Sequence, residues 1–285
     1  NLRFSTEQTE ALQAFAKRSR VTVNTVLQGA WALLLHRYSG ARDLLFGATV
    51  SGRTPELAGV DEMVGLFINS LPVRVAIRPD QKLADWLRSL QDQNAALRQY
   101  EWTPLSHIQR WSDVPNGTPL FDSLMVFESY PEPEDDGIPP SLVIEPLAAR
   151  SSGGYTLTQG RNNYPISLMV EPGRELCLIV CYAHRRFAHA AITHMLDHLE
   201  RLLVAMVEAR DALLGNMALT TEGEQRQLVE WTEIPESGRL EEACIHDLIA
   251  AQVKAVPETV AVVTKTERVT YREFDRRATR LARYL

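Results

Sequence analysis

The spacing of apolar residues predicts three long helices in the first part of the chain. Residues 189–208 carry one apolar stripe at spacings of three and four residues and form the clearest amphipathic pattern. Residues 82–100 repeat leucines in a similar way. The segment 22–40 is apolar almost all round and closes on Gly40, a residue that readily adopts a left-handed backbone conformation. We therefore expect this last helix to lie at the centre of the core.

Runs rich in β-branched and apolar residues lie between these helices and predict strands. Residues 43–53, 73–77 and 120–130 each form one such run. Residues 166–187 hold two more, which a Pro-Gly turn joins as a hairpin. Helices that alternate with strands place the chain in the α/β class.

The apolar pattern gives way to mostly polar residues near residue 220, and a new apolar pattern begins near residue 245. Residues 220–243 have few apolar positions, so they are typical of a linker that carries one short helix. A further helix is predicted around 245–253, followed by a strand at 259–263. Thr270 and Glu273 have the spacing of a capping box ahead of a last helix. We expect this segment to be the beginning of a second folded unit.

Composition and charge exclude several classes of protein. Of the 285 residues 45% are hydrophobic and 23% are charged, which is ordinary for a globular protein. No apolar run approaches the roughly 18 residues that a membrane helix needs. The net charge of -6 comes from mixed acids and bases, without a cluster of basic residues among aromatic ones. We expect neither a membrane segment nor a nucleic-acid partner.

The three cysteines offer no disulfide framework. Cys177 and Cys181 lie in one predicted strand, about 13 Å apart, which is too far for a bridge. Cys244 lies beside the linker. A reducing compartment, the cytoplasm, is expected. The chain starts without methionine or a signal-like segment, so we expect it to be cut from a longer polypeptide.

Most motifs for catalysis or metal binding are missing. His194 and His198 have the spacing of a zinc-binding helix, but Met195 occupies the position of the glutamate in HExxH. Both imidazoles fall opposite the apolar stripe and lack a third ligand nearby in sequence, so we interpret them as a solvated helix face and expect no metal site. No phosphate-binding loop or nucleophile elbow is present. Asp135 and Asp136 lie in a Pro-rich loop, where a solvated role is at least as well supported as a chemical one.

The stretch "VGLFINSLPVRV", residues 64–75, has an unusual composition for a buried apolar run. Asn69, Ser70 and Pro72 interrupt it. One interpretation is that Asn69 satisfies backbone groups at a kink before the proline. The other is that the amide serves a functional site. Arg74 belongs to an alternating strand and faces outward, where an ion pair is its expected role.

Three motifs in order resemble those of nonribosomal peptide synthetase condensation domains. Residues 64–75 match an "IGxFxNxxPxR"-type motif, "RQYEWTPLSHIQRW" takes the place of an "HQDxPFE"-type motif, and "TPLFDSLMVFESY" resembles "xPLFxxxFxxxN". Residues 220–243 resemble the linker to an adenylation domain, and residues 244–285 resemble the first residues of such a domain. The resemblance divides the chain into a lobe at 1–219, that linker and that beginning.

The resemblance implies a chloramphenicol-acetyltransferase-like fold, with a mixed sheet and packed helices, for the lobe. Such domains have two lobes around a tunnel, and the acid-base histidine of an "HHxxxDG" motif belongs to the first lobe. None of the seven histidines here fits that motif. The chain therefore resembles the C-terminal lobe alone, with no catalytic residue of its own. The sequence "RQY", where many relatives have "HQD", leaves the subtype open.

The resemblance also implies the site and the partners. Asn69 would hydrogen-bond a carbonyl or thioester of a tethered substrate, while Ser70 and Arg74 would shape the tunnel wall. The partners would be the N-terminal lobe, donor and acceptor carrier proteins and the adenylation domain. The chain would bind no cofactor directly and would meet the phosphopantetheine arms of the carrier proteins.

The activity that the resemblance implies is amide-bond formation between two carrier-bound acyl groups, with this chain alone inactive. Two alternatives stay open. One is an epimerization or heterocyclization lobe of the same family. The other is a non-catalytic platform that docks carrier proteins and supports the adenylation domain.

Overall fold

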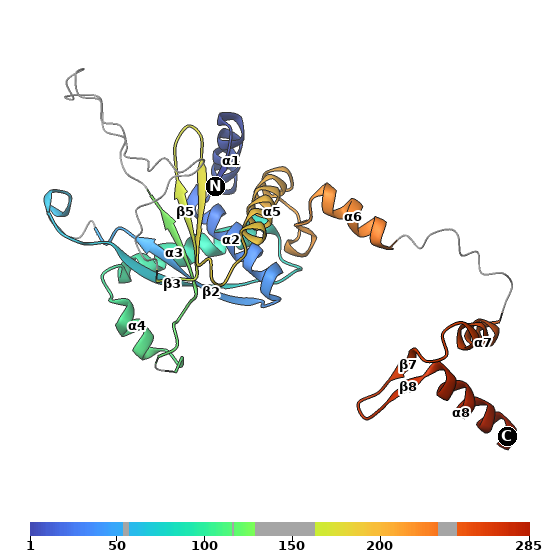
Figure 1. The fold of residues 1–285 in the computed structure, drawn as a ribbon. Coiled ribbons are helices and arrows are strands. Elements are labelled where there is room, and N and C mark those ends of the chain that lie inside the picture. The colour runs from blue at the N-terminus through green and yellow to red at the C-terminus, as the bar shows by residue number, and fades with distance from the viewer. Residues whose placement is uncertain (54–56, 116, 129–162, 233–243) are drawn as a thin grey trace. The chain divides into compact units, whose positions relative to one another are not determined.

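The computed structural model describes residues 1–53, 57–115, 117–128, 163–232 and 244–285 (Figure 1). The chain divides into two compact units, Asn1–Gln225 and Arg226–Leu285. The division falls inside the predicted linker. Asp135, Asp136 and the rest of the Pro-rich loop lie outside the described residues.

A six-stranded mixed sheet forms the framework of the first unit. Its strand order is β1-β6-β5-β4-β2-β3. The β2–β4 and β4–β5 pairs are parallel, and the others are antiparallel. The strands are β1 (Leu2–Arg3), β2 (Asp43–Val50), β3 (Asn69–Ala76), β4 (Ser123–Phe127), β5 (Ile166–Glu171) and β6 (Cys177–Tyr182).

Four helices pack with one another beside the sheet, and α2 and α3 contact strands β2 and β3 (Figure 1). They are α1 (Thr6–Ser19), α2 (Val23–Ser39), α3 (Leu83–Leu97) and α5 (His189–Glu208). Two short 3-10 turns, η1 (Val60–Glu62) and η2 (Arg98–Tyr100), and helix α4 (Leu105–Trp111) lie in the connections on either side of β3 and α3. A third turn, η3 (Leu214–Asn216), follows α5. The three predicted long helices are confirmed.

Helix α2 is the centre of the core, as predicted. Its buried residues run on all sides between Thr25 and Leu34. Trp31 is fully buried, and its indole Nε1 donates to the hydroxyl of Ser123 on β4 at 2.8 Å. The helix ends at Gly40, whose φ of 73° is left-handed. An apolar helix with a satisfied indole therefore ties the helical layer to the middle of the sheet.

The second unit is small and α/β. It contains α7 (Ile245–Ala255), the antiparallel strands β7 (Val260–Val263) and β8 (Arg268–Thr270), and α8 (Tyr271–Tyr284). Helix α6 (Glu222–Thr232) spans the division between the units. Among the described residues, no helix is both long and apolar enough to cross a membrane.

The structure differs from the sequence-based prediction at β3 and in the segment before it. The strand predicted at 73–77 begins four residues earlier, at Asn69, because β2 pairs along its whole length with β3. The interpretation of 64–75 as a buried run is wrong in its first half. Val64 and Leu66 are almost fully exposed, whereas Leu71, Val73 and Val75 are buried. The apolar alternation of the second half alone faces the core.

The contact between α2 and α3 generates a stability prediction. A Cβ added to Gly29 would lie 2.6 Å from Cδ2 of Leu87 and 3.0 Å from the ring of Trp86, both buried. Alanine favours helix by about 1 kcal/mol over glycine. Overpacking costs about 1–3 kcal/mol. We expect Gly29→Ala to lower the free energy of urea unfolding.

The control is Gly223→Ala in α6, where the nearest atom to an added Cβ is 3.9 Å away. That variant should be neutral or slightly stabilising, because propensity acts there without crowding. A Gly29→Ala protein as stable as the wild type would show that α2 and α3 are packed more loosely than described.

Candidate functional site

The segment before β3 presents apolar side chains to the surface. In residues 63–68, Met63, Val64, Leu66 and Ile68 are exposed. Two further aromatic residues, Tyr100 and Trp102, are exposed in the turn that follows α3. We call these six exposed residues the apolar patch. Exposed apolar residues on neighbouring segments are typical of a surface that meets another protein or a ligand.

Arg53 holds the segment 60–67 in place. Its guanidinium lies over the ring of Phe67, 4.4 Å from the centroid, and donates to the carbonyls of Val60 and Met63. Gly52 allows this close approach, because its φ is +66° and an added Cβ would lie 1.9 Å from the carbonyl oxygen of Phe67. The contacts of Arg53 therefore fix the backbone of the segment that carries Met63, Val64 and Leu66.

Asn69 fastens the two parts of the patch together. Its Nδ2 donates to the carbonyls of Glu101 at 2.9 Å and Thr103 at 2.7 Å, and its Oδ1 accepts from the backbone N–H of Ser70 at 2.9 Å. Both amide protons are therefore used by backbone groups, as the first interpretation of Asn69 expects, although the partners lie in a distant turn. Sequence reasoning missed these partners because they are 32 and 34 residues away.

Ser70 and Arg74 follow on the same strand. Ser70 is half-buried at the beginning of β3. Arg74 is exposed and forms a bidentate ion pair with Asp43 of β2, at 2.6 Å for the shortest contact. This is the ion pair expected for an outward-facing arginine. The hydrogen bond from Arg74 lowers the pKa of Asp43.

His198 is part of a second polar cluster, which corrects the interpretation of the histidine pair as a solvated face. Its side chain is only 12% exposed. Its Nε2 lies 2.8 Å and 2.9 Å from the two carboxylate oxygens of Glu224, and its Nδ1 lies 2.8 Å from the hydroxyl of Tyr38. His194, by contrast, is 63% exposed and lies 3.9 Å from Glu224. A third polar side chain near the two histidines was missed because it comes from the linker.

Charge and hydrogen bonds set the protonation of the cluster. The backbone N–H of Thr221 donates to Glu224, and together with the hydrogen bond from His198 it lowers the pKa of Glu224 to about 2. Partial burial raises the pKa of Tyr38, and Glu224 and Asp197 raise it further. At neutral pH the cluster therefore holds a carboxylate and an intact phenol hydroxyl.

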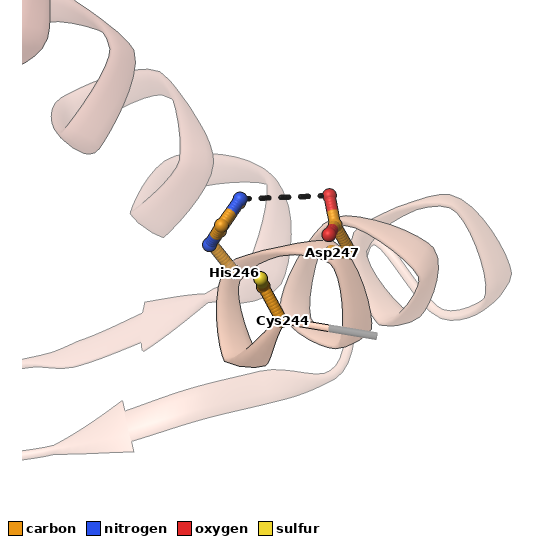
Figure 2. Close-up of side chains that lie close together, drawn as sticks. All are labelled: Cys244, His246 and Asp247. Carbon is orange, nitrogen blue, oxygen red and sulfur yellow. Dashed lines mark ion pairs between the residues drawn. The ribbon is translucent and has the colours of Figure 1, made fainter. Parts of the chain in front are cut away.

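Cys244, His246 and Asp247 form a third group at the beginning of α7 (Figure 2). Their ligand atoms lie within 4.8 Å of one another, and the His246–Asp247 contact is 3.7 Å. All three are exposed and come from four successive residues. A metal bound there would have ligands on one side only, so the group supports no metal site. The signal in the sequence is the spacing within "CIHD".

Comparison with known protein families shows to which family the chain belongs. The family model described as "Condensation domain" matches residues 1–229. The chain belongs to this family.

Curated relatives of this condensation chain are large synthases in which it matches a small part. One linear gramicidin synthase polypeptide of Brevibacillus parabrevis is 41% identical over 289 residues, covering 100% of this chain and 5% of the relative. Another polypeptide of the same synthase is 41% identical over 285 residues, covering 100% of the chain and 4% of the relative. Chondramide synthase of Chondromyces crocatus is 38% identical, covering 82% of the chain and 6% of the relative.

Solved structures share the fold. The first condensation domain of the CDA synthetase has a TM-score of 0.58 and 20% identity, with 77% of this chain and 47% of that chain covered. A four-domain nonribosomal peptide synthetase bound to AMP and glycine has a TM-score of 0.67 and 18% identity, with 95% and 21% covered. The chloramphenicol-acetyltransferase-like α/β fold is confirmed.

The low pKa of Glu224 generates a pH prediction. A carboxyl whose pKa is about 2 in the folded chain and 4.5 ordinarily stabilises the fold above pH 4.5, and this contribution is lost as the pH falls through about 2. Hydrogen bonds to a charged group contribute about 1.5–3 kcal/mol. We expect Glu224→Gln to lower the free energy of urea unfolding by about 1–3 kcal/mol at neutral pH.

The difference between wild type and variant should narrow as the pH is lowered to about 3. Glu230→Gln, on the exposed side of the same helix, is the control and should change stability little at either pH. If Glu224→Gln lowers the free energy of unfolding by the same amount at neutral pH and at about pH 3, the shape of the side chain rather than its charge matters at this position.

Proposed function

We propose that residues 1–219 form the C-terminal lobe of a condensation domain in a nonribosomal peptide synthetase. The observation that carries this proposal is that the chain covers less than half, 47%, of the solved condensation domain while 77% of the chain is aligned. The lack of "HHxxxDG" in the sequence supports it. The chain spans 4–5% of the gramicidin synthase polypeptides that it matches, so the activity belongs to a larger protein.

The reaction in the whole enzyme is amide-bond formation. The amine of the acceptor aminoacyl thioester attacks the thioester carbonyl of the donor. A C–N bond forms and the C–S bond breaks. The amine loses a proton, and the departing sulfur takes one up to become the free thiol. The N-terminal lobe would supply the acid-base histidine. The C-terminal lobe would hold the tethered substrates in reacting geometry, which can contribute much of the rate.

The apolar patch and Asn69 supply this lobe's share of the tunnel. Val64, Leu66 and Ile68 are exposed and apolar beside Asn69, as a surface against a second lobe would be. Asn69 acts first as a positioning residue, because its amide protons are bound to the carbonyls of Glu101 and Thr103. Ser70 and Arg74 continue along β3 as part of the wall.

The partners follow from this assignment. Residues 220–243 are the linker, and residues 244–285 are the beginning of an adenylation domain; the four-domain synthetase, aligned with 95% of this chain, supports this assignment. Donor and acceptor carrier proteins would present their substrates on phosphopantetheine arms. No cofactor would be bound by the chain itself, and the protein would work in the cytoplasm.

A second function has one observation in its favour. The X-domain of teicoplanin biosynthesis, solved in complex with OxyB, has a TM-score of 0.61 and 19% identity to this chain. A fold of this kind therefore occurs in a complex with another protein, which suits a docking platform without catalysis. An epimerization or heterocyclization lobe is the alternative within the family. The residues that precede Asn1 in the parent protein distinguish these possibilities by the presence or absence of "HHxxxDG".

Asn69→Ala in the parent enzyme tests the role of the amide. Loss of the amide would release the turn at 101–103 and displace the tunnel wall; because a misplacement of about 1 Å can cost about 10²-fold in rate, we expect condensation to slow by roughly 10- to 1000-fold. The measurement is dipeptidyl product by mass spectrometry under single-turnover conditions, normalised to folded protein. Asn94→Ala, on α3, is the control and should retain the rate. A folded Asn69→Ala enzyme with normal turnover would limit Asn69 to a structural role.

The chain alone is expected to form no amide bond. One lobe supplies only one wall of the tunnel, so it cannot hold both substrates in reacting geometry. The lack of the acid-base group lowers the rate by a further factor of roughly 10²–10⁴. The test mixes the chain with donor- and acceptor-loaded carrier proteins, with and without the N-terminal lobe expressed separately. Product from the chain alone, above the uncatalysed aminolysis rate, would place the catalytic group in this lobe.

A further inference from the structure

The cluster around His198 joins three separate parts of the chain. Tyr38 lies near the end of α2, His198 lies on α5, and Glu224 lies in the first turn of α6. The two ring nitrogens of the one imidazole contact the other two side chains, at 2.8 Å each. The proposed reaction uses none of these residues, so the cluster needs its own explanation.

Glu224 has two tasks in this cluster. It closes a capping box with Thr221: the carboxylate accepts from the N–H of Thr221 at 2.8 Å, and the hydroxyl of Thr221 accepts from the N–H of Glu224 at 3.2 Å. The same carboxylate also faces His198. A capping box alone organises a helix end but does not attach it to anything. The contact with His198 is what attaches this end to the lobe.

A second contact holds the segment just before this point. Arg37, the neighbour of Tyr38 on α2, donates to the carbonyls of Gly215 and Met217, at 3.1 Å each. Leu214 and Met217 are themselves buried in the core. The chain is therefore held by Arg37 at 215–217 and by the cluster at 221–224.

The proton arrangement explains why both nitrogens are needed. A neutral imidazole with its hydrogen on Nε2 donates to Glu224 and accepts from the hydroxyl of Tyr38 through Nδ1. An imidazolium keeps the contact with Glu224 and gains charge attraction. In either state Nε2 carries a proton that it donates to the carboxylate of Glu224, and the 2.8 Å between the two atoms is the distance of a direct hydrogen bond.

We propose that Tyr38, His198 and Glu224 form a latch that fastens the start of α6, and with it the first residues of the predicted linker, to the lobe. His198 is the positioning residue that closes the latch. The segment that is fastened to the lobe then extends to Gln225 rather than ending before residue 220. Opening the latch would lengthen the tether to whatever follows and so widen the range that it can reach. This inference does not depend on the reaction proposed above.

The test compares hydrogen exchange in the 285-residue chain for two substitutions of nearly equal size. His198→Gln keeps a donor at the position of Nε2. His198→Asn places its polar group near Nδ1 and removes the hydrogen bond to Glu224, whose carboxylate then keeps its contacts with Thr221. An isolated helix of 11 residues is marginal in water. We expect His198→Asn to accelerate exchange of the amides of residues 221–228 by about 10- to 100-fold, and His198→Gln to stay near wild type. Trypsin cleavage after Arg226 should accelerate in parallel.

His194→Ala is the matched control, because His194 is one turn away on the same helix and is 63% exposed. It should leave exchange in α6 unchanged. Equal exchange in His198→Asn and wild type, or an equal acceleration in His194→Ala, would overturn the latch. Faster exchange in β5 would mean that His198→Asn disturbs the core of the lobe as a whole, and Tyr38→Phe would then be used in its place. That variant removes one hydroxyl and should accelerate exchange in α6 alone; no change there would overturn the latch as well.

Discussion

The burial of α2 is the constraint on which the rest of the first unit depends. This helix is apolar on nearly all sides, so it must be covered on nearly all sides, and the sheet together with α1, α3 and α5 does so. The indole N–H of its fully buried Trp31 is satisfied by Ser123 in the middle of the sheet. The helix therefore fixes the distance and the register between the helical layer and β4. Strand β2 pairs with β4, and β3 then takes the edge of the sheet next to β2.

That position explains the composition of β3 and of the segment before it. Leu71, Val73 and Val75 face the helices, and the residues between them face away. The strand lies at the edge of the sheet, next to β2 alone. Edge strands are often covered or protected. Asn69 ties the beginning of this edge to the turn at 101–103, and the apolar patch lies beside it. An edge that exposes apolar residues in this way suits a lobe that packs against a second one.

Local patterns were predictable from the sequence, and contacts between distant segments were not. Helix α5 begins and ends at the residues that the apolar stripe predicts, because a long amphipathic pattern has few alternatives. The exposure of Val64 and Leu66 was missed because periodicity cannot tell a core from an interface. His198 was placed on a solvated face because a helical wheel does not include a linker that folds back on it. The spacing of Thr221 and Glu224 in "TEGE" is the available signal, since a capping box marks where a helix begins.

The central claim is that this chain is one of two lobes that share an apolar interface. Hydrogen exchange of residues 57–76, with and without the separately expressed N-terminal lobe of the parent protein, tests this claim most directly. We predict that the amides around Val64, Leu66 and Ile68 become protected on mixing, while those of α5 stay unchanged. Binding without protection at these residues, or no binding at micromolar concentrations of both lobes, would contradict the claim.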